Sequence, residues 1–425
     1  MPRWLYYALG LAIVAPIINF VWGSQQAPLP LVIFICSILA LIPLAALIGH
    51  ETENLEVYVG AIAGGLLNAT FGNAPELIIG IFALHAGLIS VVQASITGSI
   101  ISNALLVLGS SLAFGGWRWG RQYFNARDAG QYAAMMLLAV AGLLIPSTAF
   151  LVIHDAGRLQ AVSAAIAVVL LIVYVLYLLA HVFRVRSERR TPPYLGQTLP
   201  PELPAQEAAG EEEAHPGQGD LQIGEHQASP KNWLALLLLA IFSTALLAHV
   251  FHVHAERSKS QTALPADEAH EVPPELSAPE SQAPPKLWLT LLLLLLATLG
   301  TAWNSALLVG TIEPVTKILG WSPVFVGLVI IPIVGNVSEH TSALYIALRD
   351  HIDLSMAIAA GSSIQVATLV APLLVIISLF LPHHMNLVFQ PLELVMLGVA
   401  VLLFSIVSLD GESSWLAGVQ LMAIY

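Results

Sequence analysis

Apolar residues fill this chain in long runs, and polar residues collect between the runs. A helix of about 20 apolar residues crosses a hydrocarbon core of ~30 Å, because each residue adds ~1.5 Å of length. Runs of this kind predict spanning helices near 4–22, 29–49, 57–84, 88–114, 129–150, 159–183, 287–310, 323–348, 354–381 and 387–409. Two further apolar runs are 233–253, which is long enough to span, and Trp415–Tyr425, which is too short.

Composition changes this picture little: 57% of the 425 residues are hydrophobic and 10% are charged. Such a chain cannot bury its apolar surface in water, so it is expected to be an all-α integral membrane protein. Arg3 before the first run is also typical of a signal peptide, but the run is longer than a usual signal-peptide core, which favours a retained helix. The short N-terminus favours a prokaryotic cell membrane.

The net charge of −12 belongs mainly to two polar segments. Residues 191–230 carry seven acids without Lys or Arg, and 254–285 carry six acids against two basic residues. These Pro- and Glu-rich segments are predicted to be disordered, as solvated tethers or as loose attractors of cations. The predicted division is 1–28, an N-terminal helix and loop; 29–190, a first transmembrane repeat; 191–286, acidic linkers around the extra segment 233–253; and 287–425, a second repeat whose last helix is incomplete.

The two membrane halves resemble each other at a constant offset of 263 residues. This offset pairs Gly64 with Gly327, Gly72 with Gly335, Asn73 with Asn336, Glu76 with Glu339, Gly98 with Gly361 and Ser99 with Ser362. Internal repeats are typical of secondary transporters, which place their substrate site where the repeats meet near the bilayer midplane. The sequence therefore predicts a transporter with one shared central site.

The basic loops predict how the repeats are oriented. Arg118, Arg121 and Arg127 follow the fourth run, and four arginines between 184 and 190 follow the sixth, so both loops are expected in the cytoplasm. The two glutamate-bearing helices are then antiparallel, as in an inverted repeat, if 233–253 does not cross the membrane. We favour an interfacial, re-entrant or peripheral 233–253; a crossing would make those helices parallel.

Glu76 and Glu339 lie inside apolar runs, in Gly-Asn-Ala-Pro-Glu and Gly-Asn-Val-Ser-Glu. A carboxylate at membrane depth is costly without a cation, proton or polar partner, so these residues are the main site candidates. Pro75 and Gly72 are expected to interrupt the first helix and free carbonyl oxygens. Such irregular backbone at membrane depth lines a cavity or is buried in protein.

Neutral oxygen donors accompany both glutamates. Residues three or four positions apart share a helix face, which places an Asn beside each Glu and His340 beside Asn336. The following runs add hydroxyl and amide groups, and the candidate metal site comprises Glu76, Glu339, Asn73, Asn336, Ser99, Ser102, Asn103, Ser362, Ser363, Gln365 and His340. Oxygen donors without thiolates suit calcium. Alternatively, the neutral members only join helices.

Protons and a divalent cation would compete for the two carboxylates, because either one neutralises their buried charge. A site that reorients only when occupied would then exchange the two species across the membrane. No covalent chemistry or cofactor is needed, so the protein is not expected to be an enzyme. The expected partners are Ca²⁺, protons and the lipid bilayer, without nucleic acid; a homo-oligomer stays an open alternative.

The two glutamate motifs, together with the segments that follow them, resemble the signature repeats of the calcium/proton exchanger (CAX) family within the cation/calcium exchanger superfamily. The resemblance rests on Gly72–Leu77, Gly98–Asn103, Gly335–His340 and Gly361–Ala367, and extends to Asn68–Phe71 and Asp410–Leu416. It implies two inverted five-helix repeats plus one N-terminal helix, with broken helices at the midplane. It also implies that Glu76 and Glu339 carry Ca²⁺ and H⁺, with the Asn, Ser and Gln donors around them.

Other functions were weighed against antiport. An intramembrane metalloprotease is excluded because His50-Glu51 lacks a second His at the H-E-x-x-H spacing. A cation channel is disfavoured, since channels more often place acids in rings of identical subunits. A sodium-coupled exchanger is the nearest alternative. Further acids near the ends of the runs are expected to be interfacial and solvated, or to recruit or gate cations: Glu51, Glu53, Glu56 and Glu313, with a structural or modulatory Glu393.

Overall fold

The structure, a computed structural model, describes residues 9–23, 28–59, 67, 70–188 and 286–425. The chain divides into two units. Residues 1–181 and 269–425 form the unit that holds the helical bundle, and of the other unit, 182–268, only 182–188 at the end of one helix are described. The predicted acidic linkers and the segment 233–253 lie outside the described residues.

The first half contains short N-terminal helices followed by long apolar ones. Its elements are η1 (Leu9–Ile13), α2 (Val14–Trp22), α3 (Leu29–Val59), α5 (Ala74–His85), α6 (Ile89–Ile101), η2 (Ser102–Val107), α7 (Leu108–Trp119), β1 (Gln122–Tyr123), α8 (Ala126–Ala149) and α9 (Ala156–Glu188). The segment η2 is a single stretch of π-helix that joins α6 to α7.

The second half repeats this order. Its elements are α11 (Leu287–Leu319), α12 (Pro323–Phe325), η3 (Val326–Ile330), α13 (Ile331–Gly335), α14 (Val337–Ala347), α15 (Ile352–Gln365), η4 (Val366–Val370), α16 (Ala371–Ser378), α17 (Pro391–Leu409), β2 (Glu412–Ser413) and α18 (Trp415–Ile424). At the offset of 263, α14 begins where α5 begins and α15 where α6 begins. The π-helical stretches η2 and η4 also overlap at this offset.

The described residues contain seven helices that are long and apolar enough to span a membrane, or eight if a bent pair is counted as one span. Most predicted runs became such helices, but α3 continues ten residues past its predicted end, to Val59. The run predicted at 57–84 is not one helix, since α3 ends at Val59 and α5 starts at Ala74. In the first predicted run, the described part forms only the short η1 and α2.

Both glutamate motifs interrupt their helices at the asparagine. Asn73 has φ −99° and ψ 17°, and Asn336 has φ −93° and ψ 17°, values that lie outside the α-helical region. The segments Pro323–Gly335 and Val337–Ala347 are bent by 57° at Asn336. The break predicted at the first motif is confirmed, and the second motif, which has no proline after its asparagine, breaks in the same way.

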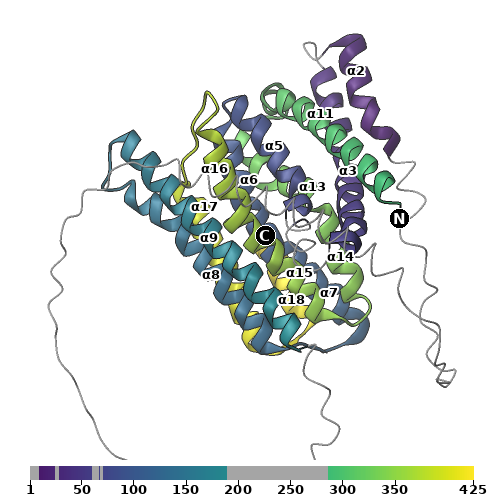
Figure 1. Ribbon diagram of the computed structural model, residues 1–425, viewed down its shortest axis with the longest axis vertical. Coiled ribbons are helices and arrows are strands. Elements are labelled where there is room, and N and C mark those ends of the chain that lie inside the picture. The colour runs from purple at the N-terminus through teal and green to yellow at the C-terminus, as the bar shows by residue number, and fades with distance from the viewer. Residues whose placement is uncertain (1–8, 24–27, 60–66, 68–69, 189–285) are drawn as a thin grey trace, which may run out of the picture. The chain divides into compact units, whose positions relative to one another are not determined.

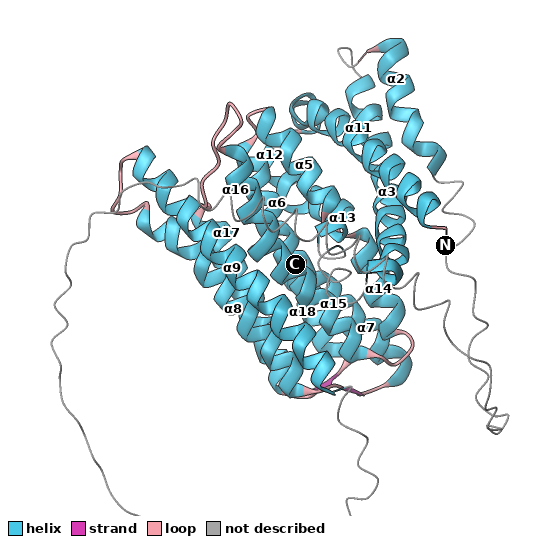
Figure 2. Cartoon of the chain, in the orientation of Figure 1, coloured by secondary structure: helices cyan, strands magenta, loops and turns pink. Residues whose placement is uncertain are grey.

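Helices from the two halves alternate within the bundle. In Figure 1, α3 and α11 lie side by side with α2 next to them, while α8, α9 and α17 lie together on the other side of the bundle. The short helices α5, α6, α13 and α15 lie between these two groups. Figure 2 shows that the described chain is helical apart from loops and one short strand pair.

Glycines let the central helices approach backbone to backbone. A Cβ added to Gly98 of α6 would overlap the carbonyl oxygen of Leu328 and lie 2.7 Å from Pro332 Cγ. In return, a Cβ on Gly327 of η3 would lie 2.5 Å from the carbonyl oxygen of Val91. Small residues of this kind allow close helix contact where lipid supplies no hydrophobic drive for association.

The two strands tie loops from different halves together. In β1 and β2, Gln122 pairs with Ser413 and Tyr123 pairs with Glu412 in an antiparallel register. Arg121 and Glu412 add an exposed ion pair of 3.2 Å. This pairing joins the α7–α8 loop to the α17–α18 loop at the basic end of the bundle.

We expect Gly98→Ala to destabilise the bundle, because the new methyl meets main-chain atoms of η3 that cannot rotate away. Overpacking of this kind costs about 1–3 kcal/mol, so the thermal midpoint of the detergent-solubilised protein should fall by several degrees. The control is Gly398→Ala in α17, where an added Cβ meets no described atom within 4 Å. Equal midpoints for the two variants, measured by size exclusion after heating, would contradict this packing.

Candidate functional site

The two candidate glutamates each lie in the first turn of a short helix that follows a break. Glu76 belongs to the first turn of α5, and Glu339 to the first turn of α14. The unpaired N–H groups of a helix N-terminus carry a partial positive charge that favours a nearby anion. Both carboxylates are thus held where the broken backbone helps to stabilise negative charge.

Glu76 is buried, with 8% of its surface exposed, and both carboxylate oxygens lack a hydrogen-bond partner in the described part of the chain. Its Oε1 lies against Gly335 of the other motif, 2.5 Å from the position of an added Cβ. Glu76 therefore points across the boundary between the halves, toward the second motif.

Glu339 has a different environment from Glu76. It is only partly buried, and its Oε2 accepts a hydrogen bond of 2.7 Å from the hydroxyl of Ser338. The residue equivalent to Ser338 in the first motif is Pro75, which has no hydroxyl to donate. A single sequence difference thus leaves one carboxylate hydrogen-bonded and the other without a partner.

The two asparagines differ in the same manner. Asn73 Nδ2 donates to Gln365 Oε1 at 2.7 Å, which links the first motif to α15. Both polar atoms of the fully buried Asn336 amide lack a partner among the described residues. The equivalent of Gln365 is Ser102, whose shorter side chain instead lies 3.4 Å from His340 Nε2.

The hydroxyl and amide donors of α6 and α15 meet where these helices cross. Asn103 Nδ2 donates to Ser362 Oγ at 2.8 Å, and Asn103 Oδ1 has no partner in the described residues. Ser363 Oγ donates to its own helix at Ala359 O, 3.0 Å, and reaches Ile100 O at 3.5 Å. Ile100 and Ser363 are 263 residues apart, so this contact joins equivalent positions of the two halves.

The structure therefore brings many predicted site residues together through contacts between the halves. Asn73, Gln365, Asn103, Ser362, Ser102 and His340 are joined in pairs, while Ser99 is buried on α6. The Ser363 hydroxyl donates its hydrogen to main-chain carbonyls, which leaves its oxygen lone pairs free, whereas Ser362 Oγ already accepts a hydrogen bond from Asn103. Gly335 and Ser338 were not among the predicted site residues, although both lie inside the second motif.

One other acid differs from the expectation of a solvated, interfacial position. Glu51 lies in the part of α3 beyond the predicted boundary, is 4% exposed and accepts a hydrogen bond from Asn54. Glu393 is 5% exposed and caps α17 through a bond from the Gln390 main chain, which fits the predicted structural role. Glu53, Glu56 and Glu313 are exposed, as expected.

This donor set suits a hard cation. The unpartnered, buried acceptors are Glu76 Oε1 and Oε2, Asn336 Oδ1 and Asn103 Oδ1, all of them oxygens. Three or more His, Cys, Asp or Glu side chains gather nowhere among the described residues in a way that could hold a metal. Amide and hydroxyl oxygens must therefore complete any coordination shell around the two carboxylates, a mixture that calcium accepts.

Comparison with known proteins agrees with this arrangement. The sodium/calcium exchanger protein family matches residues 29–183 and 289–425, which are the two membrane halves without the linker. The chain belongs to this family. A Ca(2+)/H(+) antiporter of Synechocystis is 36% identical over 406 residues, covering 95% of this chain and 90% of the relative. The Ca(2+)/H(+) antiporter ChaA of Bacillus subtilis is 33% identical, covering 93% and 90%.

Solved structures support the same fold. The structure of native YfkE matches with a TM-score of 0.66 at 29% identity, covering 99% of this chain and 95% of that chain. The H+/Ca2+ exchanger CAX matches with a TM-score of 0.58 at 14% identity, covering 98% and 86%, which shows a shared fold. The predicted all-α membrane fold of inverted five-helix repeats, with an N-terminal helix and broken helices at the site, is thereby confirmed.

We expect Gly335→Ala to weaken calcium binding while the protein still folds, because the new methyl displaces the end of the Glu76 side chain. A charged contact contributes about 1.5–3 kcal/mol, so a partial loss should raise the Kd for calcium roughly tenfold. The matched control is Gly72→Ala, where an added Cβ meets no described atom within 4 Å. Calorimetric titration of both variants with Ca²⁺ tests this; equal Kd values would refute the close contact.

Proposed function

We propose that this protein is a secondary active antiporter that exchanges Ca²⁺ for H⁺, and that Glu76 and Glu339 bind the metal or protons competitively. The observation that carries the proposal is the Glu76 carboxylate: both oxygens are buried and unpartnered among the described residues, against Gly335 of the other half. A carboxylate in that position needs a partner from outside the protein. A metal ion or a proton can supply it.

Electrostatics couples the two ions. A single charged side chain at the centre of a membrane costs about 2.5–3.5 kcal/mol on insertion scales. Two carboxylates within range of each other add mutual repulsion. One Ca²⁺ or two protons remove the net charge of the pair, so the occupied forms are the ones that can reorient at low cost, and the empty ionised form is held back.

Neutral donors complete the metal shell in this proposal. Asn336 Oδ1 and Asn103 Oδ1 are buried acceptors without a described partner, and Ser99, Ser102 and Ser362 provide hydroxyls on the crossing helices. Asn73 with Gln365, and His340 with Ser102, orient the surrounding groups through the contacts between the halves. An all-oxygen shell with flexible geometry is the preference of calcium over softer metals.

The breaks at Asn73 and Asn336 provide the means to reorient. Each separates a glutamate-bearing half-helix from the preceding segment at a residue outside the α-helical region. The π-helical stretch η2 begins at Ser102 and η4 begins directly after Gln365, and π-bulges are frequent at functional positions. Alternating access would proceed by movement of the surrounding helices about the central site, with these breaks as the points where the backbone can bend.

The named relatives support the choice of ions. Those from Synechocystis and Bacillus subtilis are both named as Ca(2+)/H(+) antiporters, at identities of 36% and 33% over most of their length. We place the protein in a prokaryotic cell membrane by the same comparison. Sodium-coupled exchange is the alternative that the family description keeps in view.

We expect Glu76→Gln and Glu339→Gln each to reduce proton-driven calcium uptake to less than about 1% of the unmodified rate, because an amide neither titrates nor offsets the charge of calcium. Uptake is measured in inverted vesicles or proteoliposomes under an imposed pH gradient. The matched control is the exposed Glu53→Gln, which should leave the rate unchanged. Calcium flux that follows a sodium gradient and ignores pH would replace this proposal by sodium-coupled exchange.

Acidification of the calcium-loading side should raise the KM for calcium and leave the maximal rate almost unchanged. Protons occupy the carboxylates that calcium needs, and saturating calcium displaces them. Initial rates at several calcium concentrations and pH values separate the two parameters. A fall in the maximal rate at constant KM would instead place proton binding away from the metal site.

A further inference from the structure

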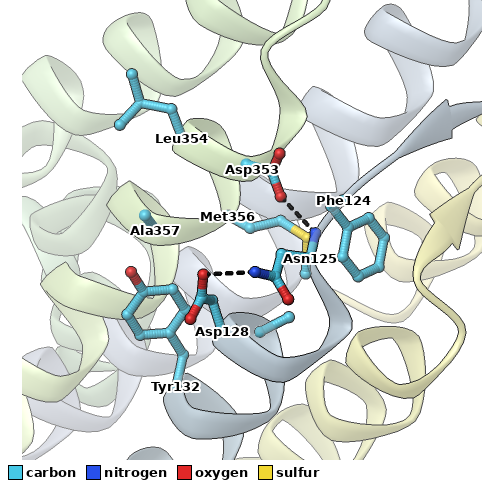
Figure 3. Close-up of a pocket in the computed structure, with 9 residues that line it drawn as sticks. Phe124, Asn125, Asp128, Tyr132, Asp353, Leu354, Met356 and Ala357 are labelled. Carbon is cyan, nitrogen blue, oxygen red and sulfur yellow. Dashed lines mark hydrogen bonds between the residues drawn. The ribbon is translucent and has the colours of Figure 1, made fainter. Parts of the chain in front are cut away.

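Residues 119–125, which we call the clamp segment, form hydrogen bonds with the turn between α14 and α15 and with the start of α15. Trp119 Nε1 donates to Leu348 O at 3.1 Å, and Gln122 Nε2 donates to Asp350 Oδ1 at 3.0 Å and to Ala347 O at 3.3 Å. The main-chain N–H of Asn125 donates to Asp353 Oδ1 at 2.7 Å (Figure 3). This turn joins the Glu339 helix to the helix of Ser362, Ser363 and Gln365.

Asp350 is the residue of this turn with a left-handed backbone. It has φ +65° and is the one described residue other than glycine with a positive φ. The left-handed conformation is unfavourable for most residues with a Cβ; Asp adopts it more readily than most, and the contacts around Asp350 help to hold it there. The equivalent residue of the first half is Gly87, which has φ +76° and no Cβ to oppose that conformation.

Gln122 donates a hydrogen bond that supports the left-handed backbone at Asp350, a support that the equivalent glycine, Gly87, does not need. Its side chain is 1% exposed and lies beneath the turn. Gly115 of α7 makes room for it, because a Cβ there would overlap Gln122 Oε1 and lie 3.2 Å from Ala347 O. One amide therefore holds both the last carbonyl of α14 and the carboxylate of Asp350.

The hydrogen bonds of Gln122 lie at one end of α14, the helix that carries Glu339. The helix has 11 residues, with the break at Asn336 at its start and the Asp350 turn at its end. A short helix moves as a rigid rod, so a shift of the turn reaches Glu339 in the first turn of α14. Packing of α14 on α3, α7 and α15 restrains the same movement, so the loss of these hydrogen bonds should shift Glu339 without unfolding the bundle.

We propose that Gln122 is a positioning residue for calcium transport, which acts on Glu339 through its hydrogen bond to Asp350. The inference rests on the proposed function, since it assigns Gln122 a part in the same calcium site. In this proposal, a loop residue of the first half sets the position of a carboxylate in the second half. In the described part of the chain, the Gln122 amide donates to Ala347 and Asp350, neither of which is a candidate ligand.

An exchange of donor and acceptor tests the proposal. Gln122→Glu keeps the size of the side chain but sets two carboxylates against each other. The double variant Gln122→Glu with Asp350→Asn restores the bond to residue 350 with donor and acceptor reversed, while the weaker bond to Ala347 O stays lost. Asn tolerates a positive φ better than most residues. The KM for calcium should rise at least fivefold in Gln122→Glu, the effect of about one lost hydrogen bond, and return to within about twofold in the double variant.

Two further measurements separate positioning from general damage. Amide hydrogen exchange of residues 347–353 should accelerate in Gln122→Glu and recover in the double variant. Arg121→Ala, which removes only the exposed ion pair with Glu412 from the same loop, should leave the KM unchanged. If Gln122→Glu does not fold, Gln122→Met removes the donor, and its combination with Asp350→Gly should recover the KM because glycine needs no such support.

The proposal is overturned if the KM for calcium is unchanged in Gln122→Glu. It is also overturned if amide hydrogen exchange recovers in the double variant while the KM for calcium does not. Failure of the proposed function looks different. In that case the unmodified protein carries no calcium in a pH gradient, and the role of Gln122 in calcium transport falls with it, although the exchange measurement still reports whether the turn has loosened.

Discussion

The cost of an uncompensated charge inside a membrane governs this protein. Glu76 is buried, and its own chain leaves both carboxylate oxygens without a partner in the described residues. A soluble protein could admit water to such a group, whereas hydrocarbon cannot stabilise it. In the function that we propose, the site takes its missing charge from the transported ions, and the requirement for neutrality links the movement of one ion to the movement of the other.

The helix breaks and the glycines make this arrangement possible. Each half-helix begins at the break, so its free N–H groups lie at the site, and Gly335 leaves the space that the Glu76 carboxylate occupies. Gly98 and Gly327 bring α6 and η3 to backbone contact, which holds the crossing helices around the carboxylates. Glycine thus serves two purposes: at Gly335 it leaves space for a carboxylate, and at Gly98 and Gly327 it allows close helix packing.

The repeats are related in backbone but differ in chemistry at the site. Ser338 donates to Glu339, while Pro75 at the equivalent position leaves Glu76 without that bond. Gln365 reaches Asn73, whereas Ser102 at the equivalent position is too short to serve Asn336 in the same way and lies near His340 instead. Differences of this kind allow two similar halves to bind their share of one ion unequally.

The sequence by itself determined the membrane class, the repeat at an offset of 263, the helix break at the first motif and the choice of Glu76 and Glu339. These features are local or periodic, since apolar length, proline, glycine and the cost of buried charge act within a few residues. Only the tertiary structure decided which donors pair, that Glu51 is buried, and that Gln122 reaches the Asp350 turn. Those contacts join residues more than 200 positions apart, or depend on where a helix ends, and the register of packed helices sets them.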